Sequence, residues 1–503
     1  MKYKNGILSA GFGILQQLLT LTFGLIIPRL FIRTYGSEMN GLLGSLGNIY
    51  SYLALVEAGV GTAAIQALYG PLGRDDKPGI NGIMAATAQF YKRAGMVYAL
   101  GVVAISTIYP LTVTTTIPRG KIILLSVLQG TGGVINFSLQ GKYMVLLQAE
   151  GKKYLLSIVT MVSYVGNNIL KLILLNCGYD VIAVHVGGFI ISLMQMVFFV
   201  YYIRKNYSWL DLRATPNKTA LNQSNAVFVQ QITWMICSNT DILVLTYIAK
   251  DLKSVSVYNV YLMIFGMIER LFSTFFGSFH YLLGQKYNTD KAGYIGFHRV
   301  YENITMTGSF VLYTIAFLLT TPFMRVYTAG ITDVAYVDEY LPFLFTFMHL
   351  LSSGREASSR VINFAGHFKQ MQWRAILESV INIVISIVLV MKIGIYGVVI
   401  GTIAASLYRA NDIILYANKH ILNRSSWNTY KLWLSNMLVF CLTAFGFRFV
   451  DLPVETIAGF FLAAVPVSLI VCSVYFISVC LLDRETAAYL LRVGKTIVRR
   501  LAK

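Results

Sequence analysis

Charged and polar side chains stand inside apolar stretches of this chain that are long enough to cross a lipid bilayer. Gln17 and Arg29 lie in the first stretch, Asn48 and Glu57 in the second, and Arg270 in another far along the chain. Polar and charged groups are costly in hydrocarbon, so they usually face the interior of a helix bundle or a water-filled cavity. An arginine presents a fixed fork of donors that suits phosphate oxygens. The sequence therefore predicts a hydrated, partly cationic cavity.

The guanidinium of Arg270 has two interpretations. In the first, it lies near mid-membrane and attracts a phosphate group; in the second, an internal pair with Glu269 or Glu57 neutralises it. Arg29 follows Pro28, which can bend its helix and turn the arginine inward. A Glu57–Arg270 pair would open when an anionic substrate competes for the arginine, which makes it a candidate trigger for a conformational change. A static buried pair is the alternative.

The composition sets the class of protein. The chain has 503 residues, of which 56% are hydrophobic and only 13% charged, and its mean hydropathy is +0.63. A soluble domain carries about 25% charged residues, so the chain is predicted to be a polytopic membrane protein. The five cysteines are odd in number and no two form a CxxC motif. We interpret them as small core residues rather than as disulfide or metal ligands.

Apolar runs of spanning length predict fourteen transmembrane helices. About 20 residues at a rise of 1.5 Å cross a hydrocarbon core of about 30 Å. The predicted spans are residues 6–32, 41–69, 94–113, 122–147, 154–176, 180–202, 226–248, 255–284, 302–324, 340–363, 375–392, 394–417, 431–449 and 456–482. The predicted fold class is therefore an all-α polytopic membrane protein.

The lysines and arginines support this topology. With the N-terminus inside, most of the 41 fall in predicted inner segments, including Arg355 and Arg409 at the inner ends of their spans. This bias satisfies the positive-inside rule and places both termini in the cytoplasm. The net charge of +19 then reflects orientation and contact with anionic lipid headgroups. Nucleic acid is excluded as a partner because no basic soluble domain is predicted to bind it.

A polar inner connection divides the first twelve spans into two sets of six. We predict an N-terminal bundle over 1–202, a cytoplasmic linker over 203–225 and a C-terminal bundle over 226–417. Two extra spans follow over 418–482. The basic, amphipathic tail over 483–503 is expected to lie on the inner membrane surface.

A faint internal repeat supports this division. Gln16 has a counterpart in Gln230, and Glu57 has one in Glu269 at nearly the same distance along the chain. Six spans are an even number, so both halves have the same orientation, as in parallel repeats related by an axis along the membrane normal.

Three motifs between residues 20 and 80 suggest a family. They are the turn Arg33-Thr-Tyr-Gly36, the segment Glu57-Ala-Gly-Val-Gly61 and the loop Leu68-Tyr-Gly-Pro-Leu-Gly-Arg-Asp-Asp76. The chain thereby resembles the polysaccharide (O-antigen type) flippases of the multidrug/oligosaccharidyl-lipid/polysaccharide exporter (MOP) superfamily. Elsewhere the resemblance depends on helix count and charge pattern. It implies two six-helix bundles in a V around a central cavity, with two extra C-terminal helices.

The resemblance also implies a site for a coupling cation. Lipid II flippases of the same superfamily are similar in having acidic and amide groups on the seventh, eleventh and twelfth helices that form a cation site. Here Asp241 lies in mid-span, and Glu378 and Asn382 are four residues apart, hence on one helix face. The expected ion is Na⁺ bound by these oxygens, or H⁺ taken up by a carboxylate. A capping or interhelical hydrogen-bonding role is the alternative.

The leading hypothesis is a flippase without covalent chemistry. It would carry a polyprenyl-pyrophosphate-linked oligosaccharide from the inner to the outer leaflet of the bacterial cytoplasmic membrane, for cell-surface polysaccharide synthesis. No cofactor is expected, and a polysaccharide polymerase and glycosyltransferases are candidate partners. One alternative is a multidrug/cation antiporter, whose more acidic cavity Arg29 and Arg270 disfavour. Another is a membrane polymerase or ligase, which generally needs a sizeable outer loop carrying His, Arg or acidic groups. Here the predicted outer loops are short and none contains a histidine.

Overall fold

The computed structural model describes residues 2–57, 60–217, 235, 239–277, 279–450, 452 and 454–483. Within these ranges, the side chains of residues 2–18, 281, 282, 288, 292, 368 and 482 are not described. The elements are α1 (Lys2–Leu53), η1 (Ala54–Glu57), α2 (Val60–Gly73), α3 (Lys77–Thr112), α4 (Arg119–Ile135), η2 (Asn136–Gln140), α5 (Gly141–Ala149), α6 (Lys153–Asn176), α7 (Val181–Asn206), η4 (Leu245–Ala249), α9 (Leu252–Gly277), α10 (His280–Thr289), α11 (Lys291–Tyr327), α12 (Leu341–Gly354), α13 (Glu356–Phe364), α14 (Phe368–Ile393), α15 (Ile395–His420), α16 (Trp427–Phe447) and α17 (Ile457–Leu482).

The chain is an all-α polytopic membrane protein, as predicted. In the part that the structure describes, every regular element is helical, and 11 helices are long and apolar enough to cross a membrane. The first two predicted spans lie in one run, Leu19–Gly73. The seventh, 226–248, falls mostly outside the described residues. The tenth is divided into α12, with 14 residues, and α13, with 9.

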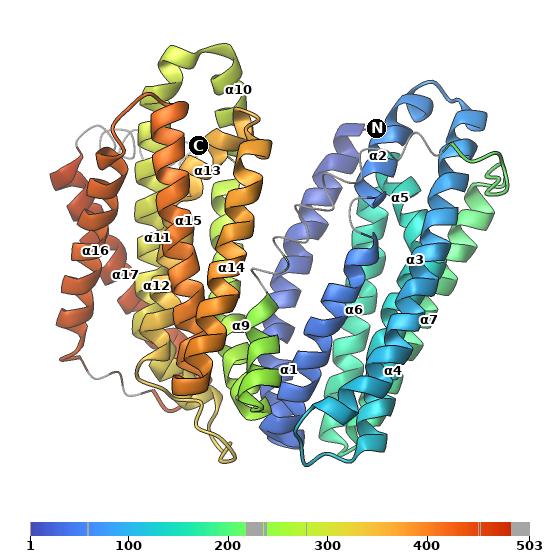
Figure 1. The fold of residues 1–503 in the computed structure, drawn as a ribbon, viewed down its shortest axis with the longest axis horizontal. Helices are drawn as coiled ribbons and strands as arrows, with labels where there is room; N and C mark the ends of the chain where they lie inside the picture. The colour runs from blue at the N-terminus through green and yellow to red at the C-terminus, as the bar shows by residue number, and fades with distance from the viewer. Residues whose placement is uncertain are drawn as a thin grey trace. The chain divides into compact units, whose positions relative to one another are not determined.

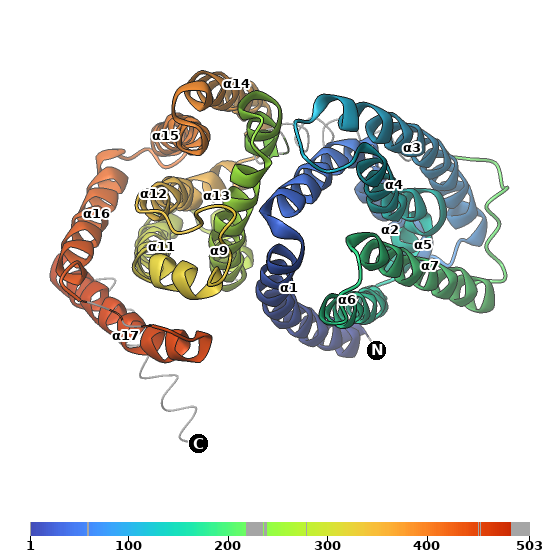
Figure 2. The same cartoon turned by 90° about the horizontal axis from the view of Figure 1, so that it is seen from below.

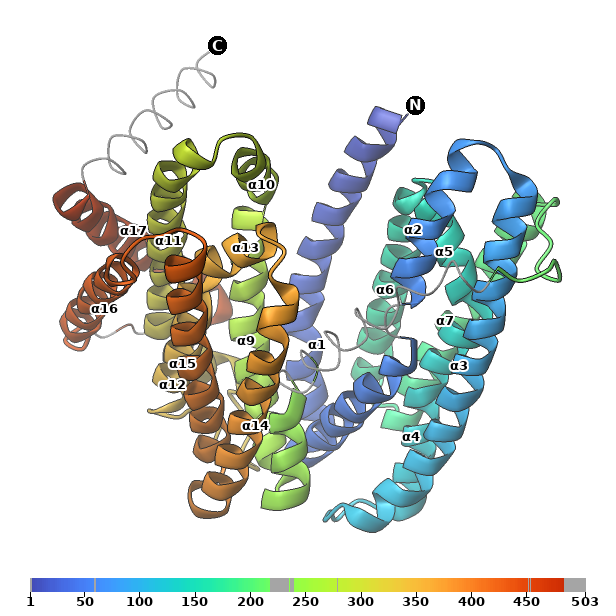
Figure 3. The same ribbon diagram turned by 45° about the horizontal axis from the view of Figure 1, so that its top comes forward.

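The chain forms two compact units, Met1–Val257 (unit 1) and Tyr258–Lys503 (unit 2). In unit 1, α3 packs along α4, α4 along α7, and α6 contacts both α1 and α7 (Figures 1 and 2). In unit 2, α14 and α15 form a tight antiparallel hairpin. The helices α12, α16 and α17 all pack against α11 (Figure 3). The predicted domain boundary at residues 203–225 stays a prediction.

The second half of α1 is joined to residues 239–256 by side-chain hydrogen bonds. Small hydroxyl and amide groups allow close approach of helices, and in a membrane they are the usual interhelical contacts. The pairs are Asn40–Ser256 at 2.7 Å, Ser45–Thr246 at 2.9 Å, Asn48–Asn239 at 3.0 Å and Tyr52–Thr240 at 3.2 Å. Residues 239–256 therefore belong to the packing of unit 1.

The α1 run turns at its predicted outer end. Gly36 has φ 85°, a conformation that favours glycine, and it separates the first two predicted spans. Two residues on, the Glu38 carboxylate accepts hydrogen bonds from the Thr115 hydroxyl at 2.7 Å and from the Thr116 amide at 2.7 Å. Partial burial by itself would raise the pKa of Glu38. The two hydrogen bonds above, and a third from the Thr116 hydroxyl, have the opposite effect and lower the pKa overall.

The two units begin corresponding helices in the same way. Asp76 caps α3 by accepting from the Gly79 amide at 3.0 Å, and Asp290 caps α11 by accepting from the Gly293 amide at 2.9 Å. The two aspartates are separated along the chain by the same interval as the glutamines of the predicted repeat. Those glutamines lie where no side chain is described, so the caps are separate support for the repeat.

Glycines in unit 1 make room for buried tyrosines. A Cβ on Gly133 of α4 would lie 2.3 Å from the ring of Tyr98, and one on Gly141 would lie 2.4 Å from the ring of Tyr91. Both tyrosines are buried on α3. Between the two glycines the chain widens into the π-helical turn η2, a distortion often found at functional sites.

We predict opposite outcomes for two neighbouring alanine substitutions in α4. Gly133→Ala places a Cβ against the Tyr98 ring and should destabilise the protein by about 1–3 kcal/mol through overpacking. Gly132→Ala is the matched control, because no atom lies within 4 Å of its added Cβ. It should be neutral or stabilising by up to about 1 kcal/mol. Denaturant unfolding in detergent measures both values; equal stabilities would contradict the packing described.

Candidate functional site

Glu57 lies at an interruption of the second predicted span. It ends the short 3₁₀ turn η1, and α2 begins at Val60. The half-buried carboxylate accepts a hydrogen bond from the hydroxyl of Tyr91 on α3. A Cβ on Gly61 would lie 2.7 Å from Glu57 Oε1, so the glycine lets the carboxylate pack against its own helix. Within the described residues, Glu57 forms no ion pair.

Arg29 lies one residue after Pro28 on α1, within a continuous helix. Its side chain is half-buried. The described part of the chain offers its guanidinium neither a hydrogen bond nor an ion pair. The side chain of Gln17, predicted to face the same cavity, lies outside the described residues.

Arg270 and Glu269 are exposed neighbours on α9. Glu269 Oε2 lies 4.0 Å from His349 Nδ1 on α12. The positive charge of Arg270 also acts on the Glu269 carboxylate. No hydrogen bond or ion pair of the Arg270 guanidinium occurs in the described ranges. Since Glu57 belongs to unit 1 and Arg270 to unit 2, the predicted Glu57–Arg270 pair stays a prediction.

Asn48 and Asp241 are both buried in unit 1, 6% and 4% exposed. Asn48 donates to Asn239 Oδ1 at 3.0 Å, two residues before Asp241. Asn48 Oδ1 is itself buried and finds no hydrogen-bond partner in the described part of the chain. A polar region thus lies between α1 and residues 239–241.

Glu378 lies in a buried ion network rather than beside amide groups. Its carboxylate contacts Arg355 Nη1 at 2.9 Å and Arg409 Nε at 3.3 Å. Arg409 also contacts Asp412 Oδ2 at 3.0 Å, and Asp412 pairs with Arg374. We call these five residues the ion network. Its members come from the α12–α13 junction, α14 and α15, and their side chains are 10–25% exposed.

Asn382 lies one turn beyond Glu378 on α14 but contacts a different group. Its Nδ2 donates to Thr402 Oγ1 on α15 at 2.8 Å, and the residue is 2% exposed. The two residues share a helix face, as the spacing predicts, but Glu378 contacts arginines and Asn382 a hydroxyl. The coupling role assigned to Asp241, Glu378 and Asn382 stays a prediction. Among the described residues no group of three or more His, Cys, Asp or Glu side chains is placed to hold a metal ion.

The partners that decide these environments were not predicted from the sequence. Arg355 and Arg409 were assigned to the inner segments, but their contacts with Glu378 were not predicted. The i, i+3 spacing of Arg409 and Asp412 inside an apolar run was an available signal. Nothing in the sequence singles out Tyr91 among the 32 tyrosines.

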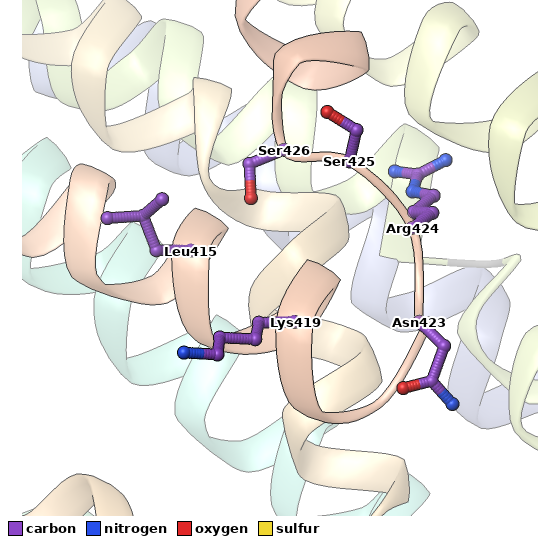
Figure 4. Close-up of a pocket in the computed structure, with 6 residues that line it drawn as sticks. All are labelled: Leu415, Lys419, Asn423, Arg424, Ser425 and Ser426. Carbon is purple, nitrogen blue, oxygen red and sulfur yellow. The ribbon is translucent and has the colours of Figure 1, made fainter.

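A surface pocket of about 680 Å³ lies elsewhere, where α15 joins α16 (Figure 4). It is lined by Leu415, Lys419, Asn423, Arg424, Ser425 and Ser426. None of the predicted site residues lines this pocket. The Arg424 guanidinium is already bound, donating to Asn418 Oδ1 at 2.6 Å and pairing with Glu302. These contacts tie the α15–α16 connection to α11.

The fold matches those of solved membrane transporters. A lipid II flippase, MurJ, in an inward closed conformation superposes with a TM-score of 0.62 at 14% identity, covering 93% of this chain and 99% of that chain. An inward-facing multidrug resistance MATE family transporter of the MOP superfamily gives 0.63 at 14% identity, over 80% and 95%. A MATE in a bent conformation gives 0.54 at 13% identity, over 86% and 99%. The chain shares the fold of these transporters. No family model and no curated protein matches the sequence.

We predict that the ion network stabilises unit 2 through paired charges. Glu378→Gln leaves the charge of Arg355 without its partner and should lower the free energy of unfolding by about 3 kcal/mol, because a buried charge is left uncompensated. Denaturant titration in detergent measures the loss. Glu455→Gln, at an exposed position, is the control.

The double variant Glu378→Gln/Arg355→Gln distinguishes pairing from packing. If the loss comes from an unpaired charge, removing Arg355 as well should recover part of it. Additive losses in the double variant would show that the two side chains do not interact energetically.

Proposed function

We propose that this chain is a MOP-superfamily transporter that moves a polyprenyl-pyrophosphate-linked oligosaccharide from the inner to the outer leaflet by alternating access. The MOP fold, shared with a lipid II flippase and with MATE transporters, supports the transporter class. The many apolar helices make the chain a multi-pass membrane protein. Its proposed location is the bacterial cytoplasmic membrane with both termini inside, where a polysaccharide polymerase and glycosyltransferases would be its partners.

The observation that carries the substrate class is the state of Arg270. This arginine lies on an apolar helix long enough to span the membrane, is exposed, and has no ion pair or hydrogen bond within the described ranges. A membrane-embedded cation without a partner is costly, and such residues usually serve a substrate or ion path. Arg29 in unit 1 has the same lack of described partners. Both guanidiniums are therefore available to an anion.

Pyrophosphate is the anion that suits these groups. Arginine binds phosphate oxygens through two parallel donors and keeps its charge at all relevant pH values. Three other arginines of unit 2, Arg355, Arg374 and Arg409, are already paired with carboxylates. Arg270 and Arg29 are thus the proposed headgroup contacts, with Glu57, Glu269, Asn48 and Gln17 as the further polar surface.

The proposed energy source is a cation gradient or the membrane potential. Asp241, Glu378 and Asn382 were assigned to coupling by family resemblance. The arginines that contact Glu378 would compete with Na⁺ for its oxygens, because both are cations within contact distance of one carboxylate. Asp241 instead lies close in sequence to Asn239, whose amide binds that of Asn48. Since amide oxygens can join a carboxylate in binding a hard cation, Asp241 is the stronger candidate of the two acids.

A multidrug/cation antiporter is the second candidate. The similarity to MATE transporters favours it as much as the similarity to the flippase favours the first, since the two TM-scores are 0.63 and 0.62. Cationic drugs, however, would be repelled by the unpaired charges of Arg29 and Arg270. Efflux of a cationic dye from proteoliposomes, without movement of lipid-linked sugar, would favour the antiporter.

We expect Arg270→Gln to slow flipping of a fluorescent polyprenyl-pyrophosphate disaccharide in proteoliposomes by about tenfold to a hundredfold. This range corresponds to one hydrogen-bonded charge contact of about 1.5–3 kcal/mol. Arg270→Lys should lose less, because it keeps the charge but not the fork. We expect Arg29→Gln to lower the rate of flipping to a similar extent.

Arg448→Gln is the matched control, since this exposed arginine follows the end of α16 and should retain the wild-type rate. Equal rates in wild type and Arg270→Gln, with both proteins folded and inserted, would contradict the proposed headgroup contact. Absence of flipping by the wild-type protein would contradict the substrate class itself.

A further inference from the structure

We propose that Glu269 and His349 share one bound proton in unit 2, and that this proton couples to the transport cycle. The site follows from the geometry of unit 2 alone, whereas its coupling role rests on the proposed function. Neither residue is among the predicted coupling residues Asp241, Glu378 and Asn382.

The imidazole of His349 is held in a fixed orientation by aromatic rings. It stacks on Phe265 of α9, with ring centroids 5.5 Å apart and planes 9° apart, and on Tyr313 of α11, at 5.2 Å and 20°. The residue is 8% exposed. Its Nδ1 lies 3.4 Å from the Tyr313 hydroxyl. The ring therefore keeps its Nδ1 edge toward Tyr313 and Glu269.

One side of this pair is accessible and the other is enclosed. The Glu269 side chain is 61% exposed, whereas that of His349 is 10% exposed, and Glu269 Oε2 lies 4.0 Å from His349 Nδ1. This distance is longer than a hydrogen bond, so sharing a proton requires the exposed carboxylate to move toward the ring. In the proposed site the proton enters at the exposed carboxylate and is shared with the buried ring.

The charges around Glu269 favour one added proton. Glu356 on α13 acts on Glu269 as a like charge, and Arg270 opposes that effect. Glu356 already has a partner, since its Oε1 lies 2.6 Å from Arg360 Nη2 and 3.8 Å from His280 Nε2. A carboxylate on which a like charge acts holds a proton more readily. Glu269 has no such arginine contact in the described residues, so in the proposed site it is the carboxylate that binds the proton.

The other helices around His349 add no competing charge among the described residues. Helix α11 contributes Tyr313, and the neutral Trp433 of α16 contacts Phe347 on α12. The charged residues of α14 and α15 near α12 belong to the ion network with Arg355: Arg374, Glu378, Arg409 and Asp412. The network is thus internally paired, and the Glu269–His349 pair is separate from it.

Packing alone does not account for a histidine here. His349 Nε2 is buried without a hydrogen-bond partner in the described part of the chain, which is unfavourable for a neutral polar group. A phenylalanine at this position would also contact Phe265 and Tyr313 and would leave no buried polar nitrogen unpaired. A polar ring that binds a proton is the chemistry that histidine provides and phenylalanine does not.

The first test follows the protonation of the six histidines by NMR in the full-length, histidine-labelled protein in detergent micelles. At pH 6 we expect Glu269→Gln to shift the ring nitrogen signals of one histidine, because the proton that the carboxylate shares with that ring is lost. The signal is assigned to His349 by its loss in His349→Gln, and His280→Gln identifies the other histidine near a carboxylate. His185→Gln and Glu455→Gln are controls that should leave the signal in place.

A result in which no histidine signal changes in Glu269→Gln overturns the proton site. Because Glu269 is exposed, this variant should fold even if His349→Gln does not, so the test does not depend on the buried substitution. A change confined to the His280 signal would also overturn the site, because it would assign the coupling to Glu356.

The second test separates the proton site from the proposed function. Flipping of the fluorescent polyprenyl-pyrophosphate disaccharide is measured in proteoliposomes with and without an imposed pH gradient. We expect the ratio of the two rates to exceed one in wild type and to fall toward one in Glu269→Gln. If wild type flips and Glu269→Gln keeps the full ratio, the coupling is overturned. If wild type does not flip but the NMR result holds, the proposed function fails and the proton site stands.

Discussion

A charge placed in an apolar interior must find an opposite charge, a hydrogen bond or water, and this requirement organises both units. Desolvation of an ion costs several kcal/mol even after relaxation. In unit 2 the requirement is met by the ion network, where Glu378 and Asp412 are shared among three arginines. In unit 1 it is met by a hydroxyl, since Glu57 is bound by Tyr91. Arg270 has neither an opposite charge nor a hydrogen bond among the described residues, and its side chain is exposed.

Interruptions of the helices coincide with these charges. Glu57 ends a 3₁₀ turn before α2, and Arg355 and Glu356 lie where α12 gives way to α13. Backbone that departs from a helix in a membrane is tolerated where it is buried in protein or lines a wet cavity. At the α12–α13 junction, Arg355 joins the ion network and Glu356 pairs with Arg360. These ion pairs lie at the point where the helix is interrupted. Transporters often place their binding sites at such discontinuous helices.

The two units share a scaffold but differ in polar chemistry. The aspartate caps at equivalent positions of the repeat begin α3 and α11 alike. The acids related by the repeat, however, have different neighbours. Glu57 contacts a tyrosine within a tightly packed, glycine-rich region, whereas Glu269 is exposed and approaches a buried histidine. Equivalent helices of the two units thus carry different polar contacts.

The sequence by itself determined the class and most of the helices. Runs of about 20 apolar residues permit little besides a spanning helix, because lipid leaves no partner for an open backbone. The same reasoning marked Arg270, Glu57 and Glu378 as polar groups in apolar spans. Their partners were decided only by tertiary structure. Whether a charged or polar side chain finds a partner depends on residues far away in sequence. Arg409 contacts Glu378, and His349 Nδ1 lies 4.0 Å from Glu269 Oε2. Hydropathy records that a charge lies in the membrane, but pairing depends on distances that only the packed helices fix.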